Sequence, residues 1–308
     1  MRLGIIGAGH VGNIVAYTAS LRGLAEEIYF YDIKKEKADS EVADLEDGNS
    51  FYPHPVKFYV GDERDMASCQ VIVVASGRIP EDANRLHEFA NNKEDVSQYI
   101  PKIMEAGFKG IFIVVTNPCD IITYSVWKNS GLSKEKIIGS GTALDSIRSQ
   151  GIIARKLGLS PTSVSSMMLG EHGDSQFLPW SQVRVCHQSL DQYLQGKKIK
   201  PEDFKKEETE KESILRGHRV FFGKGATQFG IGNTVNDILS AIKYDSKTCL
   251  NVSTLLQGQY GIEDIFISTP CVIGKNGVEQ VIELNLNSEE LVKYKASANI
   301  IQGYVDKL

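Results

Sequence analysis

The glycines near the amino terminus constrain the fold of this chain more than any other feature. Gly7, Gly9 and Gly12 form the pattern G-x-G-x-x-G directly after the short apolar run 3–6 and before the amphipathic stretch 11–21. In such a turn the first glycine permits the tight bend, the second lets a pyrophosphate approach the backbone, and the third lets helix and strand pack closely. The helix amino terminus adds N–H groups and a positive dipole for an anion. The order strand, glycine turn, helix therefore predicts a dinucleotide-binding site.

An acidic residue stands where that site needs one. Asp32 directly follows the next apolar run, 28–31, and stands 20 residues beyond Gly12. A carboxylate there accepts hydrogen bonds from ribose hydroxyls and repels a 2′-phosphate, which favours NAD over NADP. The alternative is a glycine turn in an ordinary strand-helix-strand unit with no ligand. The predicted NAD contacts in this turn are Gly7, Gly9, His10, Val11 and Gly12, with Asp32.

Short apolar runs alternate with helical stretches through the first half of the chain. Runs of four to six apolar residues suit buried parallel strands, which need helical crossovers. We therefore predict an α/β fold with a doubly wound parallel sheet of the Rossmann type. The predicted strands are 3–6, 28–31, 56–60, 71–75 and 111–116, and the predicted helices are 11–21, 35–45 and 90–105.

The pattern changes near residue 140, which predicts a boundary between a dinucleotide-binding part over 1–139 and a second part over 140–308. We expect a helix over 142–157, a strand over 163–169 and a closing helix over 288–307. Two strands, 265–273 and 278–286, flank an Asn-Gly pair typical of a β-hairpin. The charge-dense stretch 197–213 is interpreted as a solvated helix face.

Composition excludes several classes of protein and partner. The net charge of −5 disfavours a nucleic-acid or anionic-membrane surface as the main partner. No apolar run approaches the roughly 18 residues of a membrane span, and the amino terminus does not resemble a signal peptide. Five scattered cysteines without a C-x-x-C pair indicate free thiols in a reducing compartment. We therefore expect a cytoplasmic protein.

Polar clusters follow the predicted strand ends, where such sheets bind ligands. Asn117 follows one strand, Asp145 and Arg148 share a helix face, and His172 lies in the motif GEHGD. A loop over 77–86 carries two arginines. Taken singly, the Asp-Arg spacing is typical of a surface ion pair and a lone histidine of a structural residue. A metal site at 171–174 is disfavoured because no second histidine stands at ligand spacing.

In order along the chain, these motifs resemble the NAD-dependent L-lactate/malate dehydrogenase family. The resemblance covers the whole chain, and its nearest likeness is to the L-2-hydroxyisocaproate dehydrogenase branch. It implies a Rossmann domain followed by an α+β substrate domain, NAD as cofactor, a small 2-oxo or 2-hydroxy acid as substrate, and a homodimer or homotetramer. The stretches that carry it are GAGHVG, Asp32, Asn84-Arg85-Leu86, TNPCD at 116–120, SGTALDSIR at 140–148, LGEHGDS at 169–175 and KGATQFG at 224–230.

The resemblance also implies roles for individual residues. His172 is the expected general acid/base, and Asp145 is expected to fix its tautomer. Arg148 is expected to hold the substrate carboxylate bidentately, and Arg85 to polarise the substrate carbonyl. Asn117 is expected to orient substrate and nicotinamide. The remaining contacts implied are Ser140, Ser76, Gly77 and Thr116 for the cofactor and Thr227 for the substrate.

The substrate side chain is expected to meet Ile79, where lactate enzymes have Gln and malate enzymes Arg. An apolar residue there disfavours malate and suits an aliphatic acid, although three extra carbons add only about 2.4 kcal/mol, or about fiftyfold. The alternatives are that Ile79 only packs the loop, so that lactate stays preferred, or that a loop shift makes Arg78 the contact. Asp82-Ala83 also departs from the Gly-Glu that is usual in the family, so the resemblance does not determine how this loop closes over the substrate.

Gln150 and Ser165 replace the Arg and His of family members that fructose 1,6-bisphosphate activates, so no such activation is expected. Two other classes share the dinucleotide motif. NAD- and metal-dependent glycoside hydrolases need Cys/His ligands that this sequence lacks, and a non-catalytic NAD-binding protein would not need the set Asp145, Arg148 and His172.

Overall fold

The computed structural model describes residues 1–77 and 85–307. Its strands form a nine-stranded sheet in the order β12-β11-β10-β6-β5-β4-β1-β2-β3 and a small sheet in the order β7-β8-β9. The strands are β1 Arg2–Ile6, β2 Glu27–Tyr31, β3 Lys57–Val60, β4 Val71–Val74, β5 Ile111–Val114, β6 Ile137–Gly139, β7 Val164–Ser165, β8 Arg184–Val185, β9 Gln188–Ser189, β10 Thr248–Gln257, β11 Glu263–Gly274 and β12 Gly277–Val281. The helices are α1 His10–Leu21, α2 Lys35–Asp47, α3 Glu63–Ala67, α4 Arg85–Glu105, α5 Cys119–Ser130, α6 Ala143–Leu157, α7 Leu190–Gly196, α8 Pro201–Phe204, α9 Lys206–Lys224, α10 Phe229–Lys243 and α11 Ser288–Val305.

The parallel half of the large sheet has the doubly wound order that the sequence predicts. Strands β1 to β6 pair in parallel with the order β6-β5-β4-β1-β2-β3. Strands β10, β11 and β12 continue the sheet beyond β6 in antiparallel pairing. The α/β Rossmann prediction is confirmed.

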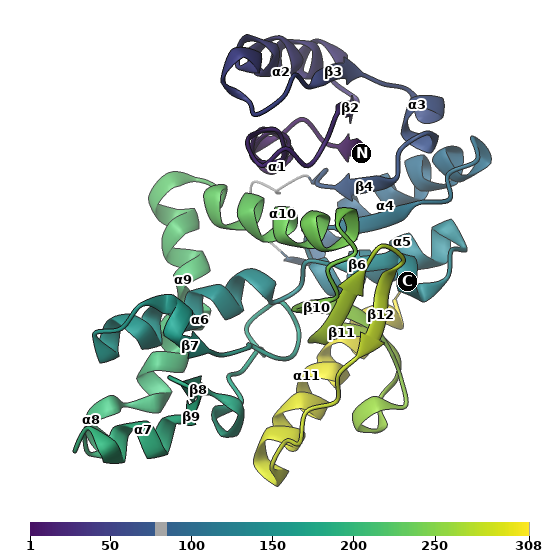
Figure 1. Cartoon of the computed structure of the whole chain (residues 1–308). Helices are drawn as coiled ribbons and strands as arrows, with labels where there is room; N and C mark the ends of the chain where they lie inside the picture. Colours follow the sequence, from purple (N-terminus) through teal and green to yellow (C-terminus); the bar gives the residue numbers. More distant parts are fainter. Residues whose placement is uncertain (78–84, 308) are drawn as a thin grey trace.

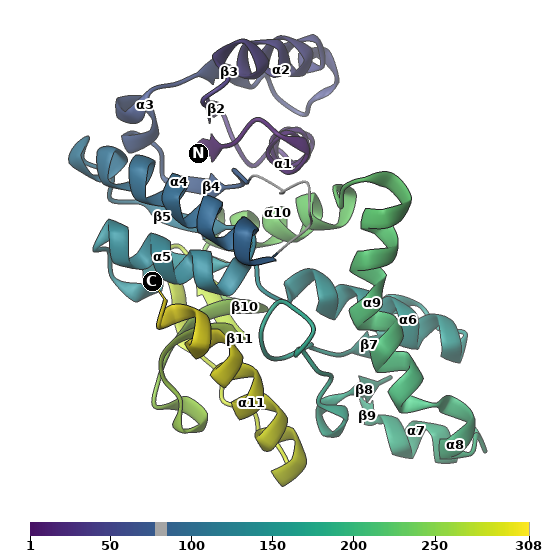
Figure 2. The same cartoon turned by 180° about the vertical axis from the view of Figure 1, so that it is seen from behind.

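Helices cover both faces of this sheet. Helices α1 and α10 pack on the face turned toward the viewer in Figure 1, while α4, α5 and α11 cover the opposite face, seen in Figure 2. Each face has its own cluster of buried apolar side chains. A third cluster joins α6 to the small sheet and to α7. The carboxyl ends of the parallel strands are therefore followed by the loops that carry the polar motifs singled out in the sequence.

Two local expectations are corrected or refined, and a third agrees with the structure. The strand predicted over 163–169 is wrong beyond Ser165, because the Met168 carbonyl accepts from the side chains of Thr142 and Asn251. The hairpin is present, but it closes with a positive φ at Gly277 (100°), which is typical of a type I turn followed by a left-handed glycine. The charged stretch lies on α8 and α9, as the prediction of a solvated helix requires.

Candidate functional site

The glycine turn has the shape that a dinucleotide requires. Gly7 has φ 101°, and a Cβ built on it would lie 2.7 Å from the Ser76 backbone. A Cβ on Gly12 would lie 2.0 Å from the Gly7 carbonyl oxygen, so helix and strand approach as closely as the motif implies. A Cβ on Gly9, by contrast, would face open space, and Gly9 caps α1 without a side-chain hydrogen bond. The first N–H groups of α1 therefore face a space that an anionic group can enter.

Asp32 is held in place beside this turn. Its Oδ2 accepts the Ala8 N–H at 2.8 Å, and its Oδ1 accepts the Lys34 N–H at 2.8 Å. These two backbone donors fix the plane of the carboxylate and leave further lone pairs on both oxygens. The residues present thus fit the adenosine half of NAD.

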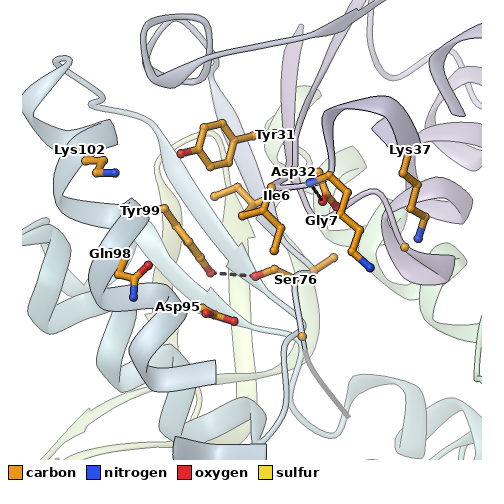
Figure 3. A pocket seen from close by; sticks show the side chains of 15 residues that line it. Ile6, Gly7, Tyr31, Asp32, Lys37, Ser76, Asp95, Gln98, Tyr99 and Lys102 are labelled. Carbon is orange, nitrogen blue, oxygen red and sulfur yellow. Dashed lines mark hydrogen bonds between the residues drawn. The ribbon is translucent and has the colours of Figure 1, made fainter. Parts of the chain in front are cut away.

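A cavity of about 380 Å³ continues from Asp32 along the sheet. Its walls come from the glycine turn, the ends of β1, β2 and β4, and one face of α4 (Figure 3). Ser76 Oγ and the Tyr99 hydroxyl lie 3.0 Å apart across it. The lining residues are Ile6, Gly7, Gly9, Tyr31, Asp32, Ile33, Lys34, Lys37, Ala75, Ser76, Gly77, Asp95, Gln98, Tyr99 and Lys102.

Sequence reasoning missed the α4 side of this cavity. Asp95, Gln98, Tyr99 and Lys102 stand at positions i, i+3, i+4 and i+7 of α4, so they share one helix face. That spacing was available in the sequence. Nothing local, however, indicated that this face of α4 would line the same cavity as Asp32.

The second group of predicted residues meets around Asp145 on α6. Its Oδ2 lies 2.8 Å from His172 Nδ1, and its Oδ1 accepts from Arg148 Nη1 at 2.9 Å. The Asp145 side chain is 2% exposed, whereas that of His172 is 29% exposed. One buried carboxylate therefore connects a reachable imidazole and a guanidinium.

The charges in this group support one another. Burial raises the pKa of the Asp145 carboxyl, but the His172 and Arg148 side chains more than offset it and hold that pKa below its usual range. Burial alone would lower the pKa of the His172 imidazole. The Asp145 carboxylate opposes this and raises that pKa above its usual range. An imidazole held this way is a good proton donor near neutral pH.

The loop that carries His172 is fixed from three elements. The Glu171 N–H donates to Ser297 Oγ on α11 at 2.8 Å, and the His172 N–H donates to Asp120 Oδ2 on α5 at 2.7 Å. Gly170 forms a bridge with Ser268 on β11. The contact with Asp120 was missed by the sequence analysis, which assigned that residue no role.

A glycine on α9 lies against Arg148. A Cβ built on Gly217 would be 3.0 Å from Arg148 Nη1, so the absence of a side chain there determines how far the guanidinium can extend. This contact was also missed, because 69 positions separate the two residues and no local pattern links them.

The other predicted residues are placed as follows. Thr116 Oγ1 donates to the Val74 backbone carbonyl at 3.2 Å. The backbone carbonyl of Asn117 accepts from Asn92 Nδ2 at 2.7 Å. Ser140 is buried with its Oγ 3.6 Å from Cys119 Sγ. Thr227 lies between α9 and α10, and its contact with substrate stays a prediction.

Arg78 and Ile79 lie outside the described residues, and so does the side chain of Arg85, the first residue of α4. Their predicted roles are therefore untested by the geometry. Among residues 1–77 and 85–307, no group of three or more His, Cys, Asp or Glu side chains is arranged to hold a metal. None of the helices described is long and apolar enough to cross a membrane.

Comparison with known proteins matches both halves of the chain. Residues 1–139 match the model of the lactate/malate dehydrogenase NAD binding domain. Residues 142–307 match that of the lactate/malate dehydrogenase alpha/beta C-terminal domain.

Curated relatives and solved structures match along the full length. L-lactate dehydrogenase 1 of Bifidobacterium longum is 34% identical over 305 residues, covering 99% of this chain and 96% of the relative. L-lactate dehydrogenase 2 of Listeria monocytogenes is 37% identical over 301 residues, covering 97% and 96%. The ligand-bound crystal structure of the minor L-lactate dehydrogenase of Enterococcus mundtii superimposes with a TM-score of 0.95 at 31% identity, covering 100% of this chain and 98% of that one.

Proposed function

Because the chain belongs to the lactate/malate dehydrogenase family, we propose that it is an NAD-dependent L-2-hydroxy acid dehydrogenase. It interconverts a small 2-oxo acid and the matching L-2-hydroxy acid. The observation that carries the proposal is the Asp145 carboxylate, which binds His172 through one oxygen and Arg148 through the other. This arrangement combines a proton donor and an anion-binding group, which reduction of a 2-oxo acid requires.

His172 is the proton donor in this proposal. Asp145 accepts from Nδ1, so the opposite nitrogen, Nε2, presents the proton to the 2-oxo oxygen of the substrate. The carboxylate stabilises the imidazolium before transfer and keeps the ring oriented after it. NAD(H), when bound, takes up or supplies the hydride.

Arg148 binds the substrate carboxylate. Within the described residues, only its Nη1 is seen donating a hydrogen bond, to Asp145. The other N–H groups of the guanidinium are available for a bidentate contact. Arg85 polarises the substrate carbonyl in the same proposal, on the strength of the family resemblance alone.

The substrate is either pyruvate/lactate or a longer aliphatic pair. The relatives' names favour lactate, since those compared are L-lactate dehydrogenases. Ile79 favours an aliphatic acid such as 2-hydroxyisocaproate and disfavours malate, because an apolar side chain cannot pair with a second carboxylate.

The test is steady-state NADH oxidation with pyruvate, 2-oxoisocaproate and oxaloacetate, with His172→Asn as the matched variant. We expect turnover with the first two acids and much less with oxaloacetate. His172→Asn should bind NADH normally, measured by its fluorescence, while turnover is lost. Failure of the wild type on a full panel of 2-oxo acids would instead support a non-catalytic NAD-binding protein, and loss of activity on chelation would support a metal-dependent hydrolase.

We also propose a division into a cofactor domain over 1–139 and a catalytic domain over 140–308. It is supported by the change of pairing beyond β6, where β10 joins the sheet in antiparallel orientation. Expression of residues 1–139 alone tests it: this fragment should fold and bind NADH, and an insoluble or non-binding fragment would contradict an independent cofactor domain.

A homodimer or homotetramer in the cytoplasm completes the proposal. Helix α10 packs against both α1 and α6 (Figure 1). All three helices carry exposed large apolar side chains, namely Tyr17 and Leu21 on α1, Ile147 on α6 and Phe229 on α10. Such residues are typical of an interface between subunits. All five cysteines are free thiols, which suits a reducing compartment. A monomeric mass by light scattering would contradict the assembly.

A further inference from the structure

A second carboxylate contacts the backbone of His172. Asp120, the second residue of α5, is 1% exposed, and its Oδ2 accepts the His172 backbone N–H at 2.7 Å. In the part of the chain that the structure describes, its Oδ1 forms no hydrogen bond of full geometry, although the Ser253 hydroxyl lies near enough to favour the ionised carboxyl. Asp120 is therefore a buried acid that is only half satisfied.

Such a group is costly, and its hydrogen bond does not explain why it is an acid. Burial raises the pKa of the Asp120 carboxyl to about 6, although the nearby Ser253 hydroxyl and the His172 N–H act in the opposite direction. An asparagine could accept the same N–H through its amide oxygen without a buried charge. The negative charge is therefore what distinguishes Asp120 from an asparagine at this position.

The charged and titratable groups around this pair identify its target. His172 is faced by Asp145 and Arg148 from α6 and by Asp120 from α5. Asp120 is faced in turn by His172 and Glu171 from the 170–174 loop. The neutral Cys119 and Tyr294 also lie within its electrostatic reach. Among these groups, the imidazole is the one that gains a positive charge in the working pH range.

We propose that Asp120 is a positioning residue of the acid/base site: its carboxylate fixes the His172 backbone, and its negative charge, together with that of Asp145, stabilises the imidazolium form. The inference rests on the proposed function, in which His172 gives a proton to the substrate. Asp145 acts on the ring through its contact with Nδ1, and Asp120 acts through its hydrogen bond with the backbone N–H and through its charge.

Asp120→Asn isolates the charge, because the amide can keep the hydrogen bond to the His172 N–H. The pH titration of His172 is followed by NMR of labelled histidine, with the resonance assigned through His172→Asn. We expect the midpoint to fall by about one pH unit, a tenfold loss of proton affinity. The pH at which kcat/KM for pyruvate reduction declines should fall by the same amount.

Glu290→Gln is the matched control. Glu290 is also a buried carboxylate, 6% exposed, but it accepts from the Ser181 N–H at 2.9 Å and is not among the groups that face His172. This variant should leave the His172 midpoint unchanged. Ser253→Ala gives a second variant at the site. It removes a hydroxyl that favours the ionised Asp120, so the His172 midpoint should fall in the same direction by a smaller amount.

The outcomes separate this inference from the proposed function. Because the NMR titration needs no turnover, an inactive wild type would contradict the function whatever Asp120 does. An active enzyme whose His172 midpoint is the same in wild type, Asp120→Asn and Ser253→Ala would overturn the role of Asp120 alone. A shift of equal size in Glu290→Gln would also overturn it, since the effect would then not be specific to the Asp120 carboxylate.

Discussion

Adding a single methyl group at Gly217 should displace Arg148, the residue proposed to bind the substrate carboxylate. A Cβ at this position would lie 3.0 Å from Arg148 Nη1, 3.7 Å from its Cζ and 3.8 Å from its Nη2. Ordinary contacts between such atoms begin near about 3.5 Å, so the guanidinium must retreat by about 0.5 Å. Its Nη1 is held at 2.9 Å by Asp145 Oδ1, and the movement must strain or rotate that ion pair.

The expected kinetic effect follows from this displacement. Since a misplacement of about 1 Å can cost about a hundredfold, half that distance corresponds to about tenfold in kcat/KM. Gly217→Ala should therefore lower kcat/KM for pyruvate by about tenfold, mainly through KM, with NADH affinity unchanged. Folding should not suffer, because alanine is favoured over glycine in a helix by about 1 kcal/mol.

Gly223→Ala is the control on the same helix, because a Cβ there would meet no atom within 4 Å. It should show the same gain in stability and unchanged kinetics. The assay is NADH oxidation with pyruvate and with 2-oxoisocaproate. An equal loss with both acids identifies the shared carboxylate as the affected group. Unchanged kcat/KM in Gly217→Ala, or a loss that grows with side-chain length, would refute the reasoning.

Three further predictions concern other parts of the site. Arg148→Lys should lower kcat/KM for pyruvate by about a hundredfold, since an ammonium cannot form the bidentate contact; a change below about threefold would contradict the assigned role. Fructose 1,6-bisphosphate should leave the affinity for 2-oxo acids unchanged, because Gln150 donates to the Val164 carbonyl and Ser165 carries no charge; a sharp rise in affinity would contradict this. Asp120→Asn should stabilise the protein at pH 8 by up to about 3 kcal/mol, measured by urea unfolding. The reason is that burial raises the pKa of Asp120 in the folded state to about 6, so the wild type loses stability as the pH rises from the unfolded-state pKa through the folded-state pKa. The gain should disappear below about pH 3, where the wild-type carboxyl is protonated in both states. An equal gain at about pH 8 and at about pH 3 would contradict the linkage.

Local patterns were sufficient for the glycine turn and for five of the six parallel strands, whereas β6 was not predicted. Strand β4 is a fully apolar run, and β1 and β2 continue with mainly apolar or aromatic residues after Arg2 and Glu27. The helices between the strands are longer and have one polar face, so the period and length of the apolar pattern distinguish helix from strand. Helix α5, by contrast, was not predicted. Its buried residues include Cys119, Ile121 and Val126 but also the polar Asp120 and Thr123, so the helix has no clear polar face.

The site was predictable only where the resemblance supplied a motif. The meeting of Asp145, Arg148 and His172 followed from family motifs, and the structure brings these side chains together. Asp120 and Gly217 could not be found in the same way. Each acts on a residue distant in the sequence, and the contact exists only because α5 and α9 pack against the segments that carry His172 and Arg148.

A single-turnover experiment tests the central claim most directly. Wild type and His172→Asn are each saturated with NADH, mixed with excess pyruvate, and followed by the loss of NADH absorbance. The account predicts stoichiometric oxidation of bound NADH in the wild type, with a rate that falls as the pH rises through the raised pKa of His172, and a rate lower by at least about a thousandfold in His172→Asn. Comparable oxidation in His172→Asn, with the same dependence on pH, would contradict the role of His172 as proton donor.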